Sequence, residues 1–271
     1  MAALTLALRD DGPEEQMRAA ADLLGALGID VRADLGDLDR AGTAAQAAAP
    51  LLQTASLVGG DGSRWAGQSD GALLAQGRAS AQGAAAFAQF GVPRLLGLAE
   101  ALAAPGARML DVGTGVAALA VAYAELFPTL TVVGLDVLPR VLALAAETIA
   151  ASAVAARVVL REQDVSALDD EAIYVLGWIP APFVPERALR EGVPRVARAL
   201  APGGWAMVGH GKFAGDPVED ALSRFKTVAY GGTALNDDQA QQMLRDVGLT
   251  DVMTLPTPPG APAVTFGRKS P

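Results

Sequence analysis

ARMLDVGTGVAALAVAYAELFPTLTVVGLD, residues 107–136, is the stretch that decides the fold of this chain. It reads as an apolar strand, a glycine turn, an alanine-rich helix and a second apolar strand that ends on an acid. A glycine turn between strand and helix lets a ligand approach the backbone closely, because glycine has no Cβ atom. Asp136, at the tip of the second strand, can accept hydrogen bonds from ribose hydroxyls. The stretch therefore predicts a site for a nucleoside-bearing cofactor.

Apolar strands alternate with helical segments from residue 108 onward, which is typical of an α/β sheet with a parallel core. The last two strands are joined by a short connection rich in proline and glycine, too short for a helical crossover, so they should pair antiparallel. The predicted strands are Arg108–Val112, Thr131–Leu135, Arg157–Arg161, Ile173–Trp178, Gly204–Gly209, Asp251–Leu255 and Ala263–Phe266. The predicted helices between them are Val116–Leu126, Arg140–Ser152, a short one near Ser166, Glu186–Leu200 and Asp237–Val247.

The first 105 residues have a different composition, rich in alanine and leucine and poor in β-branched residues, which favours helices. We predict helices at Pro13–Leu27, Thr43–Leu57, Ala72–Phe90 and Pro93–Ala103. The chain is therefore expected to consist of a helical cap or accessory region, residues 1–105, and a cofactor-binding domain, residues 106–271.

Composition and charge narrow the function. The formal net charge of -9 argues against binding a phosphate backbone, so no nucleic-acid partner is expected. The absence of cysteine excludes disulfides, cysteine nucleophiles and thiolate metal sites, and no metal is expected. The N-terminus lacks a basic region before its apolar residues, and no uninterrupted apolar run reaches the roughly 18 residues of a membrane span. We therefore expect a cytoplasmic protein without a membrane partner.

The glycine turn itself leaves two cofactors open. Gly113-Thr114-Gly115-Val116-Ala117-Ala118 satisfies the looser dinucleotide fingerprint G-x-G-x-x-A, and Asp136 lies where that fingerprint also requires an acid. On these features alone an NAD(P)-dependent oxidoreductase is viable.

Other motifs favour a different cofactor. Asp111 precedes the first glycine on the strand itself, Gln163-Asp164-Val165 follows the third strand, and an Ala-Pro-Gly-Gly turn launches the fifth. With these features the chain resembles the class I S-adenosylmethionine-dependent methyltransferases over roughly residues 90–268. The matching segments are MLDVGTGVA at 109–117, VVGLD at 132–136, REQDV at 161–165 and RALAPGGW at 198–205. The resemblance implies an α/β fold with a Rossmann-like, mostly parallel seven-stranded sheet that ends in an antiparallel hairpin, preceded by the N-terminal helical region.

The resemblance also implies a donor, S-adenosyl-L-methionine, with S-adenosyl-L-homocysteine as product. The glycine turn would pack under the methionine part, with Asp111 organising the turn and the amino group; a turn that serves packing alone is the alternative. Asp136 would bind both ribose hydroxyls or cap the following helix, and Asp164 would bind the adenine amine or cap the helix near Ser166. The implied cofactor-binding residues are Asp111, Gly113, Thr114, Gly115, Asp136, Val137, Gln163, Asp164 and Val165.

The acceptor is less defined. The segment after the fourth strand, residues 178–183, lacks the acid or amide before Pro-Pro that marks many nucleic-acid and protein-amide methylating members, so we expect a small-molecule acceptor, as in specialised metabolism. At the carboxyl ends of the strands, Trp178 is a candidate wall of the methyl-transfer channel and His210 a candidate base. The candidates for acceptor binding are Trp65, Gln76, Arg78, Phe87 and Phe90. A homodimer through the N-terminal helices, and a repurposed binder that serves regulation or cyclisation, also stay open.

Overall fold

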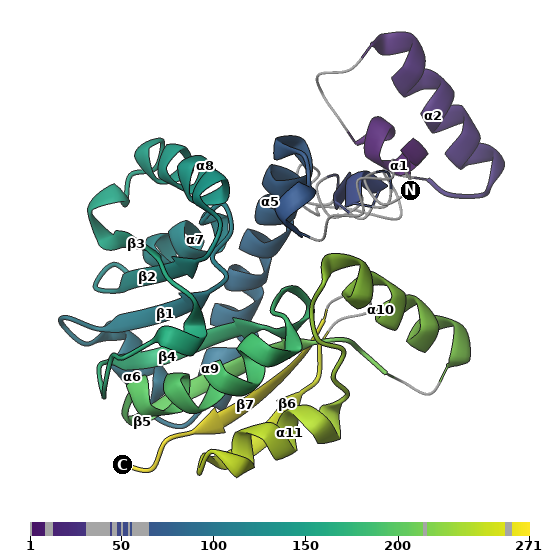
Figure 1. Cartoon of the computed structure of the whole chain (residues 1–271). Coiled ribbons are helices and arrows are strands. Elements are labelled where there is room, and N and C mark those ends of the chain that lie inside the picture. The colour runs from purple at the N-terminus through teal and green to yellow at the C-terminus, as the bar shows by residue number, and fades with distance from the viewer. Residues whose placement is uncertain are drawn as a thin grey trace.

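The structure is a computed structural model. It describes residues 2–8, 13–30, 44, 48–49, 51–53, 55, 65–213, 216–257 and 262–271, and for residue 219 the backbone alone. Within these ranges the chain forms a mixed α/β structure around one sheet of seven strands (Figure 1).

The sheet has the strand order β3-β2-β1-β4-β5-β7-β6. The first five strands run parallel, whereas β7 is antiparallel to both of its neighbours, which confirms the predicted terminal hairpin. Because the chain leaves β1 toward β2 on one side and later returns to β4 on the other, the loops after β1 and β4 diverge there, which makes this edge a switch point for ligand binding. The strands are β1 Arg108–Val112, β2 Thr131–Asp136, β3 Val158–Glu162, β4 Tyr174–Pro180, β5 Leu200–His210, β6 Thr250–Leu255 and β7 Ala263–Arg268.

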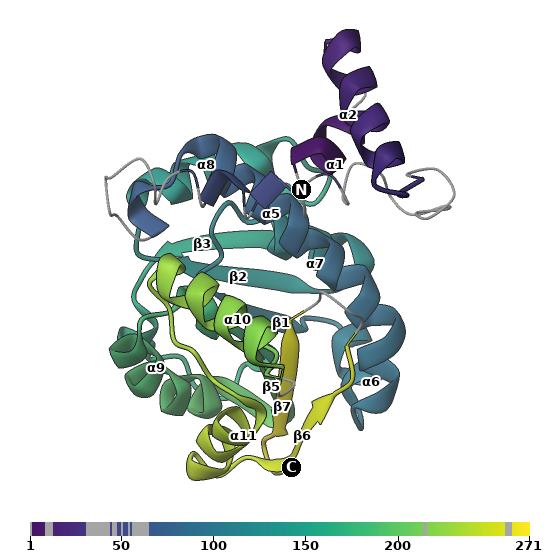
Figure 2. The same cartoon turned by 90° about the vertical axis from the view of Figure 1, so that its right-hand side faces the viewer.

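Helices cover both faces of the sheet (Figure 2). One face carries α6 (Leu98–Ala103), α7 (Ala118–Leu126) and α8 (Pro139–Ala150), and α5 (Asp70–Ala86) packs on α7. The other face carries α9 (Glu186–Ala199) and α11 (Asp237–Asp246). The α10 helix (Pro217–Tyr230) lies beside the carboxyl ends of the strands, and α1 (Ala2–Ala7) packs on α2 (Glu14–Ala26) apart from the sheet.

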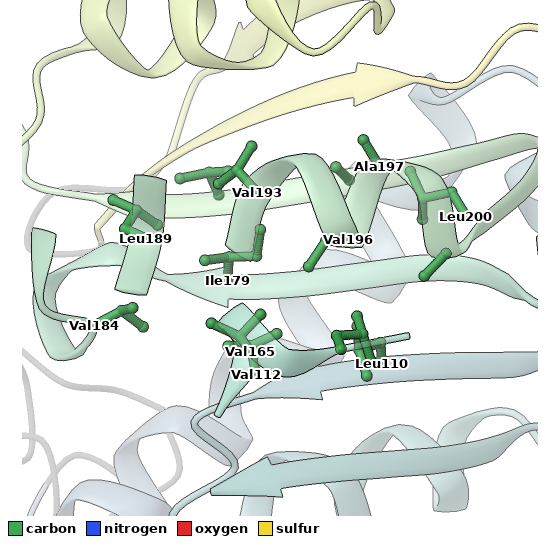
Figure 3. Packing of buried hydrophobic residues seen from close by; sticks show 14 of the residues in the cluster. Leu110, Val112, Val165, Ile179, Val184, Leu189, Val193, Val196, Ala197 and Leu200 are labelled. Carbon is green, nitrogen blue, oxygen red and sulfur yellow. The ribbon is translucent and has the colours of Figure 1, made fainter. Parts of the chain in front are cut away.

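Apolar side chains of the sheet alternate between these two faces. The core under α9 and α11 joins strand residues to the inward stripe of α9, as Figure 3 shows for Leu110, Ile179 and Val196. The opposite core contains Met109, Leu176 and Trp205, which are register partners across β1, β4 and β5. Both faces of the central strands are therefore buried, as expected of a parallel sheet. The candidate site lies at the carboxyl ends of these strands.

Several predicted boundaries were wrong. The β4 strand continues two residues past Trp178 to Pro180, because Ile179 and Pro180 still register with β5. The α7 helix begins at Ala118 and not at Val116, since Ala117 adopts a left-handed backbone at its N-cap. Gly97 in the same conformation begins α6, so the predicted helix at Pro93–Ala103 is shorter.

The predicted helix at Ala72–Phe90 begins earlier, capped by Ser69, and its last turn is a π-turn at Phe87–Gly91. The α2 helix confirms the prediction at Pro13–Leu27, whereas most of the predicted helix at Thr43–Leu57 lies outside the described residues. Among the described residues, no helix combines the length and the apolar character needed to cross a bilayer.

Candidate functional site

The glycine turn after β1 forms an open cradle. Gly113 and Gly115 have φ values of 63° and 58°, in the left-handed region that disfavours other residues. A Cβ atom on Gly113 would approach only Pro180 Cγ, at 3.8 Å, and one on Gly115 only the Gly113 carbonyl oxygen, at 4.0 Å. The two glycines therefore satisfy the left-handed backbone of the turn, and the positions where their Cβ atoms would lie are nearly free of neighbouring atoms.

Asp111 and Thr114 stabilise this turn from below. The Thr114 hydroxyl donates a 2.7 Å hydrogen bond to Asp111 Oδ2, and the Thr114 N–H donates to the Leu135 carbonyl oxygen at 2.8 Å. Burial raises the pKa of the Asp111 carboxyl to about 7; the bond from Thr114 opposes this shift, and the nearby Asp136 carboxylate adds to it. Asp111 is 1% exposed, so a negative charge on its carboxyl is unfavourable unless a positively charged group binds nearby.

Asp136 joins the turn to the loop after β2. Its Oδ2 accepts the Gly115 N–H and its Oδ1 accepts the Leu138 N–H, both at 3.0 Å. Burial raises the pKa of Asp136, and these backbone bonds oppose the shift. Each carboxylate oxygen keeps a lone pair for a further donor, such as one of two vicinal hydroxyls. Val137, next in the chain, is 53% exposed and presents an apolar surface beside the acid.

The loop after β3 lies next to Asp136. The Gln163 N–H donates to the Asp136 carbonyl oxygen at 2.9 Å, and the Gln163 side chain donates to the Ala167 carbonyl oxygen. Asp164 caps the short 3₁₀ turn Val165–Ala167, because its Oδ1 accepts the Ser166 N–H at 2.8 Å. The capping role considered for Asp164 is thus present. These groups suit a nucleoside: a carboxylate with lone pairs left for hydroxyl donors, an apolar side chain and a second acid lie on adjacent strand ends.

Three aromatic rings from distant parts of the chain meet beside this cradle. The centroids of Phe183 and Tyr230 are 4.8 Å apart with nearly parallel planes, and Trp65 packs edge-on against Phe183 at 4.9 Å and against Tyr230 at 6.4 Å. Trp65 also packs against the cluster formed by Leu73, Val116 and Val141. The cluster of Trp65, Phe183 and Tyr230, called the three-ring cluster below, therefore adjoins both the glycine turn and the start of α8.

Arg140 connects the N-terminal region to the cofactor loops. Its guanidinium pairs with the Asp70 carboxylate and donates to the carbonyl oxygens of Gln68, at 2.6 Å, and Ala66, at 3.3 Å. Arg140, Phe183 and Tyr230 were not predicted as site residues from the sequence. The contacts described above join residues at least 47 positions apart in the chain, so they leave no local pattern. Only the position of Phe183 just after a strand end could have indicated it.

The other predicted acceptor residues are not brought together. Phe87 is partly buried and packs against the core, stacked on Phe266 at 5.7 Å and edge-on to Tyr123, so its contacts do not support the role predicted for it at the acceptor. Gln76 is engaged by Gln53 and Ser80. The side chains of Arg78 and Phe90 are exposed.

The two predicted catalytic residues lie on opposite faces of the sheet. Trp178 is the register partner of Asp111 on the face of α7, is partly exposed, and its ring lies across Gly209, where an added Cβ would approach Trp178 Cη2 to 2.3 Å. His210 faces α11 and has no exposed surface. Its Nε2 bonds Thr265 Oγ1 at 2.8 Å and its Nδ1 lies 3.0 Å from the Gly211 carbonyl oxygen. Burial lowers the pKa of His210, and this geometry does not support the predicted base role.

Chemically, the site can bind a nucleoside through Asp136 and its neighbours and can place an apolar or aromatic molecule beside it. Among the described residues, no group of three or more His, Asp and Glu side chains is placed to hold a metal ion. The arrangement therefore offers binding and positioning more than acid–base chemistry.

Comparisons with known proteins agree with this geometry. Residues 109–204 match the family described as a methyltransferase domain. A search of curated proteins gave no match.

Solved structures share the fold over nearly the whole chain. A putative O-methyltransferase from Nostoc punctiforme is 17% identical, over 98% of this chain and 88% of that chain, with a TM-score of 0.65. Human N-acetylserotonin methyltransferase, solved in complex with SAM, is 15% identical over 100% and 92% of the two chains, with a TM-score of 0.65. An O-methyltransferase family protein from Burkholderia thailandensis is 18% identical over 99% and 94%, with a TM-score of 0.61.

Proposed function

We propose that this chain, a class I S-adenosylmethionine-dependent methyltransferase, methylates a hydroxyl group of a small molecule. The observation that carries the proposal is the open glycine turn joined to Asp136, which offers a ribose-binding acid directly beside free space. The match to a methyltransferase domain covers this same segment.

The residues of the cradle would bind the cofactor as follows. Asp136 accepts from the ribose hydroxyls, Val137 packs against the adenine, and Asp164 and the Val165 N–H recognise the adenine edge. The free space before Gly113 and Gly115 receives the methionine part. Asp111, deprotonated on binding, balances the positive charge of the amino group. Gln163 and Thr114 support these groups through backbone and side-chain bonds.

The bound cofactor supplies an electrophilic methyl group. This chemistry would move the methyl group from the sulfonium sulfur to a hydroxyl oxygen of the acceptor, with the C–S electrons left on sulfur and the hydroxyl proton passed to the bulk solvent by the time the product is released. The chain contributes by holding the acceptor in line and by excluding water. We propose Trp178 as a wall of this reaction space, since it lies beside Asp111 and is partly exposed.

Two observations support a hydroxyl of a small molecule as acceptor. Structures with the same fold over the whole chain carry O-methyltransferase names, and human N-acetylserotonin methyltransferase, by its name, acts on a small molecule. The net charge of -9 also opposes a polyanionic acceptor. We propose that residues 1–105 form a cap over the acceptor and that the protein is cytoplasmic. We also propose a homodimer formed through the N-terminal helices, and sedimentation velocity would test this oligomeric state.

Turnover tests the proposal. The purified chain, S-adenosyl-L-methionine and a panel of hydroxylated small molecules should yield S-adenosyl-L-homocysteine together with a product heavier by one methylene group. Stoichiometric release of S-adenosyl-L-homocysteine with an acceptor that gains no methyl group would indicate cyclisation or another repurposed reaction. Binding without turnover across the panel would favour a regulatory protein.

A further inference from the structure

The polar groups of the three-ring cluster differ from those of Trp205 and Tyr174 in the core. In the core, Trp205 donates its indole N–H to the Leu96 carbonyl oxygen at 3.2 Å, and Tyr174 donates its hydroxyl to Asp170 at 2.6 Å. Trp65 and Tyr230 are partly exposed, and among the described residues neither polar group has a hydrogen-bond partner. Trp and Tyr are enriched at binding interfaces because each combines an apolar ring with a polar group that can face water or a ligand.

The three-ring cluster packs close to the glycine turn. Phe183 lies three residues after Pro180, the last residue of β4, and Pro180 Cγ lies 3.8 Å from the position of a Cβ atom built on Gly113. On the other side, Trp65 packs against the apolar group of Leu73, Val116 of the glycine turn and Val141 of α8. The three-ring cluster is therefore close to the cofactor cradle both through Pro180 and through Val116. An acceptor bound on the cluster would lie next to the donor.

Hydrogen bonds and an ion pair from Arg140 hold the segment that contains Trp65. Residues 65–70, called the strap here, are bound to the first turn of α8 through Arg140, which reaches two strap carbonyl oxygens and Asp70. Gln68 of the strap is 2% exposed, and among the described residues its side-chain oxygen has no hydrogen-bond partner. A buried, unpaired acceptor costs free energy. The strap therefore contains one unpaired amide oxygen, and its attachment to α8 through Arg140 fixes the position of Trp65.

We propose that Trp65, Phe183 and Tyr230 bind the acceptor as a hydroxylated aromatic ring system, and that Arg140 is the positioning residue that holds Trp65 for this purpose. This inference rests on the proposed function and adds its substrate class. Ring faces favour a planar aromatic partner through stacking and edge contacts. The indole N–H of Trp65 and the hydroxyl of Tyr230 are donors, so they select an acceptor that bears oxygen and not an ammonium group. Burial raises the pKa of Tyr230 to about 12, which keeps this donor protonated.

The test compares pairs of probes. Saturation-transfer NMR, with saturating S-adenosyl-L-homocysteine, measures binding of 2-naphthol, 5-hydroxyindole and 7-hydroxycoumarin, and of their ring-saturated alcohols. We expect each aromatic probe to bind about 5–10-fold more tightly than its saturated counterpart. Trp65→Leu and Tyr230→Leu should abolish this preference, Tyr230→Phe should retain most of it, and Phe225→Leu, which changes an exposed aromatic residue of α10, should leave it intact.

The positioning role of Arg140 is tested by comparing the affinities for the aromatic probes and for S-adenosyl-L-homocysteine in Arg140 variants. Arg140→Gln should weaken the aromatic probes about 3–10-fold while the affinity for S-adenosyl-L-homocysteine changes less than about twofold, and Arg140→Lys should restore part of the loss. Asp70→Asn, which leaves the two carbonyl bonds, should have a smaller effect. Three results would overturn the inference. The wild-type protein could show no saturable binding of the aromatic probes, or it could bind them no more tightly than their saturated counterparts. The preference could also survive in both Trp65→Leu and Tyr230→Leu. Failure to bind S-adenosyl-L-homocysteine, by calorimetry without any probe, would instead overturn the proposed function.

Discussion

Replacing Asp111 with Asn should make the cofactor-free protein more stable, and increasingly so as the pH rises. The carboxyl is 1% exposed, and burial raises its pKa from 3.8 to about 7. A carboxyl whose pKa is raised in the folded state stabilises the fold below its unfolded pKa and loses that contribution as the pH rises to its folded pKa. The wild-type protein therefore carries an increasing cost between pH 4 and pH 7.

The size of the effect follows from the two pKa values. At about 1.36 kcal/mol for each pKa unit, the full cost at pH 8 is roughly 4 kcal/mol, and somewhat over a third of it is already present at pH 5. The Asn side chain keeps an oxygen for the Thr114 hydroxyl and carries no charge. Relative to wild type, Asp111→Asn should thus gain about 2–3 kcal/mol of unfolding free energy between pH 5 and pH 8.

Urea unfolding of the cofactor-free protein at both pH values measures this gain, provided that the denaturant slope m stays the same. Glu147→Gln, which neutralises an exposed carboxylate on α8, is the matched control and should stay within about 0.5 kcal/mol of wild type at both pH values. A difference between Asp111→Asn and wild type that does not change with pH would refute the reasoning. The same variant should bind S-adenosyl-L-homocysteine more weakly, because the negative charge facing the amino group is lost.

Three further substitutions test other contacts of the site. Asp136→Ala removes the acceptor for the ribose hydroxyls and should weaken S-adenosyl-L-homocysteine by about 1–3 kcal/mol in calorimetry; an unchanged affinity would remove Asp136 from the site. Gly134→Ala would place a Cβ atom 2.7 Å from Thr114 Oγ1, so it should displace Thr114 and lower both the melting temperature and the cofactor affinity, whereas a variant with wild-type values would show that the turn tolerates the movement. His210→Asn breaks the bond to Thr265 and should cost about 1–3 kcal/mol of unfolding free energy while the cofactor affinity is unchanged; lost turnover in a fully stable variant would restore the base role.

The cofactor half of the site could be predicted from the sequence because its parts are local. Gly113, Gly115 and Asp136 lie within one strand–turn–helix–strand unit, where spacing alone fixes which groups meet. The terminal hairpin was predictable for the same reason, since a short connection allows only one pairing direction. The third position of the motif was less clear: Ala117 adopts the left-handed backbone of a glycine, a strained conformation that its sequence does not reveal.

The acceptor side could not be predicted in the same way. Trp65 was a candidate from the sequence, but its contact with Phe183 and Tyr230 arises only when three separate segments pack at one sheet edge. Phe87 was also a candidate from its helical position, whereas the fold stacks it on Phe266. His210 stands at a strand end, as a base should, but strand alternation turns it toward α11. Tertiary packing decides each of these residues, and local pattern does not.

The central claim is that the glycine turn and Asp136 form an S-adenosylmethionine site and not a nicotinamide site. Calorimetric titration of the purified chain with S-adenosyl-L-homocysteine and, separately, with NADH tests it most directly. The account predicts saturable binding of one S-adenosyl-L-homocysteine per chain, weakened by Asp136→Ala, and no saturable binding of NADH. Saturable binding of NADH without binding of S-adenosyl-L-homocysteine would contradict it.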